Sequence, residues 1–129
     1  VQAIAHDTVT KLQLNGELHD PNGAFDNSSG YDYTVPAGQG GCYFVSAQFT
    51  VAAMAANKTM ILGIQKGGTN MFYAYTVTAA SEDNTVCASG TLVLAAADVI
   101  TVVGYHNHGS SRNASHSNNQ NHLSIQRVA

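Results

Sequence analysis

Charged residues are scarce in this chain: Asp, Glu, Lys and Arg make up only 10% of its 129 residues. An average soluble domain has about 25%. The few basic residues are scattered singly and the formal net charge is −3. No basic stripe is available to neutralise phosphates, so nucleic acid is not an expected partner. Neutral surfaces cost little to desolvate, which favours a domain covered by copies of itself or by a large assembly.

Long apolar runs are also missing. No stretch approaches the roughly 18 residues of a membrane span, and the opening VQAIAHDTVT lacks a basic region followed by an apolar core. We therefore expect neither a membrane segment nor a signal segment. The length predicts a single domain over residues 1–129, large enough to bury a core of its own.

Catalytic motifs are absent. The sequence has no GxSxG nucleophile turn and no GxGxxG or phosphate loop. Its acidic residues fall in predicted loops without a facing pair for acid–base work. The two cysteines lack the CxxC spacing of a zinc site. The sequence predicts a protein that is not an enzyme and holds no cofactor or metal.

Alternating apolar and polar residues are what the sequence does have, and they predict about eight short strands. These cover residues 9–14, 31–35, 42–51, 59–66, 71–78, 84–94, 99–108 and 122–128. The glycines of GGTN (67–70) predict a hairpin turn. Only 54–57 and 94–98 are candidates for helical turns. The pattern indicates an all-β antiparallel fold, either a double-sheet jelly-roll sandwich or a barrel.

A family resemblance narrows this choice. Residues 22–51, residues 85–102 and the terminal HLSIQRV resemble the complement globular-head and tumour-necrosis-factor-like jelly rolls, in the divergent form found in bacteriophage virion proteins. In that family an aromatic strand, a proline and a glycine lead into the third major strand, and the matching positions here are Pro36, Gly41, Tyr43 and Val45.

The match also has departures. The Gly-Asp turn that the family has before its penultimate strand reads Ala97-Asp98 in this chain, and the terminal Phe-Ser-Gly reads Leu123-Ser124-Ile125. These differences concern a local turn and details of the core. The order of elements along the chain agrees with the family, and the resemblance implies a jelly-roll β-sandwich.

The resemblance also implies a homotrimer, and two predicted strands are apolar on both faces. In 42–51 the main apolar face runs from Tyr43 to Val51, and Phe44 lies on the opposite face. In 71–78, Phe72 opposes a face with Tyr73 and Tyr75. On each of these strands, one face would pack on the core and the other would contact a neighbouring subunit. The candidates for the trimer interface are Phe44, Phe72, Tyr73 and Tyr75.

Cys42 and Cys87 are the only cysteines. The family topology places their strands side by side, and a disulfide then needs a register that brings the two Cα atoms to about 5.5 Å. The sequence does not fix this register. The alternative is two buried free thiols, since free cysteine is among the most buried residue types.

Histidines cluster near the end of the chain. His106 and His108 alternate on one predicted strand, and His116 follows in the loop 109–121. Three imidazoles suit a transition metal, but no carboxylate in the loop would orient them. We therefore expect an exposed surface that recognises a glycan or a protein. Its candidate residues are His106, His108, Arg112, Asn113 and His116.

Together these features predict a non-enzymatic, trimeric virion protein, either a bacteriophage capsid decoration (cement) protein or a fibre knob. Its expected partners are itself, capsid or fibre proteins and a host-surface glycan, and its expected location is the virion. The alternative is a secreted, complement-like recognition module for protein or carbohydrate. The sequence contains no Gly-X-Y repeat of a collagen stalk, which makes this alternative the weaker one.

Overall fold

The computed structural model describes residues 2–115 and 120–129, and these residues form strands without any helix. The prediction of an all-β protein is confirmed. The strands are β1 (Ala3–Ile4), β2 (Thr10–Lys11), β3 (Asp32–Thr34), β4 (Gly41–Met54), β5 (Thr59–Lys66), β6 (Thr69–Val77), β7 (Glu82–Leu94), β8 (Val99–His106), β9 (Arg112–Asn113) and β10 (His122–Arg127).

Several strand ends differ from the predictions. β5 has the predicted bounds, β4 and β7 are longer than predicted, and only Thr10–Lys11 of the segment 9–14 is a strand. The two candidate helical turns were wrong, because both segments reverse the chain between strands. Asn57 and Ala97 have φ angles of 59° and 70°, which lie in the left-handed region and exclude a right-handed helix.

One long hairpin runs through the middle of the sequence. Its tip is the turn at Gly67 and Gly68, with φ angles of 54° and 85°, so the hairpin predicted from GGTN is confirmed. Moving away from the tip, β5 pairs with β6, β4 with β7, and β3 with β8, always antiparallel. The chain from β3 to β5 is thus paired in reverse order with the chain from β6 to β8.

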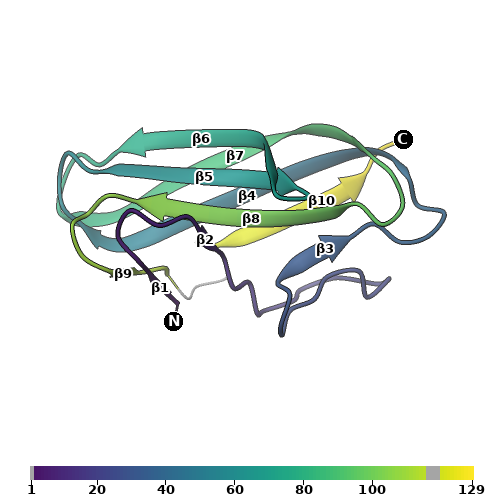
Figure 1. Ribbon diagram of the computed structural model, residues 1–129, viewed down its shortest axis with the longest axis horizontal. Helices are drawn as coiled ribbons and strands as arrows, with labels where there is room; N and C mark the ends of the chain where they lie inside the picture. Colours follow the sequence, from purple (N-terminus) through teal and green to yellow (C-terminus); the bar gives the residue numbers. More distant parts are fainter. Residues whose placement is uncertain (1, 116–119) are drawn as a thin grey trace.

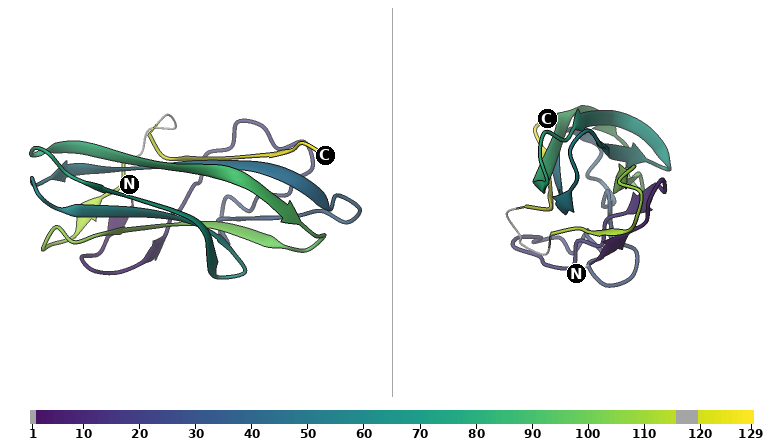
Figure 2. Two further views of the ribbon diagram at one scale, coloured as in Figure 1. Left: turned by 90° about the horizontal axis from the view of Figure 1, so that it is seen from above. Right: turned by 90° about the vertical axis from the view of Figure 1, so that its left-hand side faces the viewer.

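This hairpin is folded over into two facing sheets (Figures 1 and 2). The first sheet has the order β10-β4-β7. The second has the order β2-β8-β5-β6, with β3 also paired to β8. β1 and β9 form a small separate sheet. In the end-on view of Figure 2 the N-terminal residues lie on the side of the molecule away from β6 and β7.

The core lies between the two sheets. Every second residue of β4 from Tyr43 to Val51 faces it and is at most 2% exposed, as the alternation predicted. β5 supplies Met60, Leu62 and Ile64 from the opposite sheet. Burial of these apolar side chains is the main favourable term in folding.

Two phenylalanines cross the core and lie on glycines of the opposite sheet. Phe49 of β4 lies against Gly104 of β8, where an added Cβ would be 2.7 Å from the ring. Phe72 of β6 lies against Gly90 of β7, where an added Cβ would be 2.3 Å from the ring. At such distances any side chain would displace the aromatic ring, since cores are close-packed. The two contacts run in opposite directions between the sheets and set their separation.

The Phe72–Gly90 contact can be tested by double mutation. Gly90 is not among the positive-φ glycines, so alanine suits its backbone and only the ring opposes the new Cβ. We expect Gly90→Ala to lower the free energy of unfolding by about 1 to 3 kcal/mol through overpacking. In a Phe72→Ala background the same change should cost little. Urea unfolding of the four proteins measures this coupling, and purely additive effects would contradict it.

Candidate interaction surfaces

The outer face of the β10-β4-β7 sheet carries no charged residue in its central rows. Phe44 lies between Thr91 and Gln126. In the next rows, Ser46 lies between Ser89 and Ser124, and Gln48 lies between Cys87 and His122. No Asp, Glu, Lys or Arg stands in these described rows. Phe44 is 43% exposed and Val93, opposite Cys42, is 78% exposed. We call this surface the neutral face. Removing it from water on binding costs little free energy, because its central rows carry no Asp, Glu, Lys or Arg.

Both cysteines lie on the neutral face, but they do not form a disulfide. β4 and β7 are neighbours, as the resemblance implied, but Cys42 is opposite Val93 and Cys87 is opposite Gln48. This offset of six residues corresponds to about 20 Å along the strands, far beyond the reach of a disulfide. Both thiols are free. The alternative of two buried thiols is also wrong, because Cys42 is half-buried and Cys87 is exposed.

An apolar surface runs along β6. Met71, Tyr73, Tyr75 and Val77 are all between 42% and 65% exposed. The Tyr73 and Tyr75 rings have their centroids 6.4 Å apart. We call this surface the β6 stripe. The interface candidates Phe44, Tyr73 and Tyr75 are thus accessible, whereas Phe72 was wrongly assigned, because its ring packs inward against the core and Gly90.

His106 is a core residue rather than part of an exposed recognition surface. Its side chain is fully buried. Its Nε2 lies 2.9 Å from the Ile4 carbonyl oxygen, and its Nδ1 accepts a hydrogen bond from the His108 backbone N–H at 3.2 Å. The neutral tautomer with the proton on Nε2 satisfies both contacts. The prediction of exposure for His106 was therefore wrong, and His106 connects the β1 segment to the end of β8.

His108 is half-buried beside Arg112. Its Nδ1 accepts a hydrogen bond from the Ala55 backbone N–H at 3.1 Å, and its Nε2 contacts the Arg112 guanidinium. Burial, followed by the positive charge of Arg112, lowers the pKa of His108. The Arg112 Nε is buried without a hydrogen-bond partner. His108 and Arg112 therefore form part of the packed structure at this end of the domain.

The predicted recognition set is not assembled as one surface. Asn113 is exposed and pairs with Ala3 at the start of the chain, while His106 and His108 face inward. His116 lies outside the described residues. Among the residues that the structure does describe, no group of three or more His, Cys, Asp or Glu side chains is placed to hold a metal ion.

The protonation of His108 predicts a dependence of stability on pH. Its pKa is lower in the folded chain than in the unfolded one, so the unfolded state takes up a proton first as the pH falls. Neutral His108 therefore contributes fully to the free energy of unfolding above the ordinary histidine pKa of about 6.5. This contribution is lost progressively as the pH falls below that value. We expect the melting temperature to fall between about pH 7.5 and pH 5.5, and this fall to be smaller in His108→Gln. Thermal unfolding followed by circular dichroism measures both, and equal pH dependence in the two proteins would contradict the assignment.

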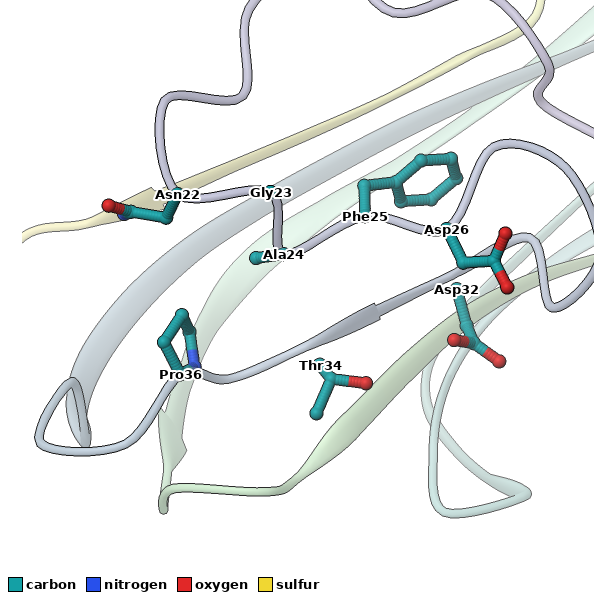
Figure 3. Close-up of a pocket in the computed structure, with 8 residues that line it drawn as sticks. All are labelled: Asn22, Gly23, Ala24, Phe25, Asp26, Asp32, Thr34 and Pro36. Atoms are coloured by element: carbon teal, nitrogen blue, oxygen red, sulfur yellow. The ribbon is translucent and has the colours of Figure 1, made fainter.

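A shallow pocket of about 370 Å³ lies beside the loop before β3 (Figure 3). Asp26 lies at one end of it. Its carboxylate accepts hydrogen bonds from the backbone N–H groups of Ser28, Ser29 and Gly30 and from both serine hydroxyls. These bonds hold the pKa of Asp26 far below its usual range, and the bond from the Ser28 backbone N–H has the largest effect. The carboxylate therefore holds the loop in shape through these hydrogen bonds.

A second, larger hollow is a groove of about 1130 Å³ between β10 and the loop that follows β2. Both apolar and polar side chains line it. The sequence pattern does not predict this groove. Its only signal was the alternation of Leu123 and Ile125 in the last strand, which predicts a strand but not that one of its edges is open. The apolar and aromatic residues of the lining include Leu12, Leu14, Tyr33, Tyr43, Leu123 and Ile125. The charged residues and histidines of the lining include Glu17, His19, Asp20, His122 and Arg127.

The sequence matches no model of a known protein family, and no curated protein is similar to it. In the described part of the chain no helix is long and apolar enough to cross a membrane.

Proposed function

We propose that this chain is a non-enzymatic, homotrimeric jelly-roll module of a virion, a bacteriophage capsid decoration protein or fibre knob that works through protein–protein contacts. The observation that carries the proposal is the pair of accessible, uncharged surfaces, the neutral face and the β6 stripe. Contiguous exposed apolar groups on a small domain mark interaction sites.

The nested strand pairing supports a jelly roll. A jelly roll is a double-sheet sandwich of antiparallel strands with Greek-key connections. Here β5-β6, β4-β7 and β3-β8 are nested pairs of one hairpin, and β4-β7 lies in the sheet opposite to the other two. Folding a single long hairpin across two sheets gives connections of this kind, and it agrees with the family resemblance.

The position of the two surfaces supports a ring. They lie on opposite sheets, the neutral face on β10-β4-β7 and the β6 stripe on the last strand of the other sheet. When two different patches of a protein bind one another, the contact is heterologous and copies close into a ring if the rotation allows it. We propose that the β6 stripe of each subunit packs on the neutral face of the next, around Phe44. Three subunits are what the family resemblance implies.

Light scattering tests the trimer. The expected mass at micromolar protein is about three times the 13.5 kDa of one chain. Phe44→Asp and Tyr75→Asp should each give monomers, because a carboxylate buried in an apolar contact costs several kcal/mol. Val9→Asp is the control, since Val9 is an apolar residue as exposed as Tyr75 but belongs to neither surface. A monomeric parent chain, or dissociation by all three variants, would contradict the arrangement.

The virion role predicts where the protein is found and what its loss does. A decoration trimer binds only the assembled shell and stabilises it by mass action. Purified particles should contain the chain, and particles without it should burst at a lower temperature and be rescued by added protein. Normal heat stability with lost host attachment would assign the fibre knob instead. Absence of the chain from purified particles would contradict both roles and favour the secreted module.

A further inference from the structure

One edge of the β10-β4-β7 sheet is open. β10 pairs with β4 on one side, and within the described residues no other strand pairs with it. An unpaired strand edge presents a row of backbone N–H and C=O groups that can template another strand. β10 has six residues, which correspond to about 20 Å of edge.

The hydrogen bonds next to β10 show which of its residues face outward. The Val128 backbone N–H donates to the Cys42 carbonyl at 2.8 Å. Hydrogen-bonded positions alternate along an antiparallel ladder, so the residues that bond to β4 are His122, Ser124 and Gln126. The backbone groups of Leu123, Ile125 and Arg127 then point away from β4. No described residue outside β4 forms a hydrogen bond with these backbone groups.

The open edge forms one wall of the large groove. All six residues of β10 line it, and the loop after β2 forms the opposite wall. The side chains of Leu123 and Ile125 are partly buried against the core. The loop after β2 lies across the groove from the β10 edge, where a second folded domain would have to approach. The groove therefore fits an extended segment better than the edge of another sandwich.

The neighbouring segment of the same chain does not fill this place. The Leu12 backbone N–H donates to the Val102 carbonyl at 2.9 Å, and the Gln13 backbone N–H donates to the Gln2 side chain at 2.8 Å. These bonds tie the segment after β2 to β8 and to the N-terminal residues. The backbone N–H groups of Leu12 and Gln13 are thus used in these bonds and not in bonds to β10.

The far wall also carries negative charge. Glu17 is exposed, with Asn27 as a side-chain neighbour at 3.4 Å, and Asp20 accepts a hydrogen bond from the Phe25 backbone N–H at 2.7 Å. On the side of β10 the cation Arg127 is held at one end by the Gly40 carbonyl at 2.8 Å. A ligand crossing the groove towards the loop therefore meets carboxylates, which favour a basic side chain.

We propose that this groove binds an extended segment of another polypeptide, which adds to β10 as a further strand. Its backbone would bond to the outward groups of Leu123, Ile125 and Arg127. Its apolar side chains, two residues apart, would enter the groove over Leu123 and Ile125, and a Lys or Arg would face Glu17. Main-chain bonds provide affinity and alternate side-chain pockets provide specificity in this mode of binding. The proposal goes beyond the virion role and does not depend on it or on the trimer.

Hydrogen exchange of the free protein is the first test. The backbone amides of Leu123, Ile125 and Arg127 should exchange faster than those of Ser124 and Gln126, as followed by NMR. Equal protection of both sets would overturn the proposal. Protection of the first set that increases with protein concentration would also overturn it, because the occupant would then be a second copy of this chain.

The ligand class is tested with a library of random linear peptides of about twelve residues, long enough to cover the edge with flanking residues on both sides. Enriched peptides should have alternating apolar residues and a basic residue. Once synthesised, they should slow exchange at Leu123, Ile125 and Arg127. N-methylation at successive positions should abolish binding at every second position only, because alternate amides of an added strand face β10. No enrichment, or loss of binding without this alternation, would overturn the proposal.

A charge reversal tests the far wall without touching the core. Glu17→Lys should weaken binding of a selected basic peptide about fivefold, the upper range for an exposed ion pair. Glu82→Lys is the matched control, since Glu82 is also exposed but starts β7 outside the groove lining. Equal affinities of the two variants for the peptide would overturn the assignment of the basic residue to Glu17. A common melting temperature shows that both variants are folded.

Discussion

The packing of Phe49 on Gly104 and of Phe72 on Gly90 is the constraint on which the arrangement of the two sheets depends. Each sheet contributes one ring and one glycine, so neither sheet can shift along the other without a clash. The separation of the sheets then determines which residues of β4 and β6 are buried. It also determines that the alternate residues, including Phe44 and Tyr75, are left on the outside.

The polar groups near the ends of the sandwich are used for structure. His106 and His108 bond to the backbone of β1 and of the turn after β4, and Asp26 bonds to the backbone of its own loop. Buried or bonded groups of this kind maintain connections that apolar packing alone does not specify. The neutral face, the β6 stripe and the edge of β10 beside the groove remain accessible.

Much of the fold could be predicted from alternation. The bounds of β5, the turn at Gly67 and the buried face of β4 follow from the order of apolar and polar residues, because a strand turns successive side chains to opposite faces. That Tyr73 and Tyr75 share a face opposite to Phe72 follows in the same way. Alternation does not say which face of a strand is the outer one, and for this reason Phe72 was assigned to the wrong side.

The sequence by itself determined that the chain is all-β, where most strands lie and which residues share a face, because these properties are local. The tertiary structure alone decided the register between β4 and β7 that separates Cys42 from Cys87, and the burial of His106 beneath Ile4. It alone decided that β10 has an open edge beside a groove. These properties depend on pairings between residues far apart in the chain, and no local pattern encodes the partner of a strand.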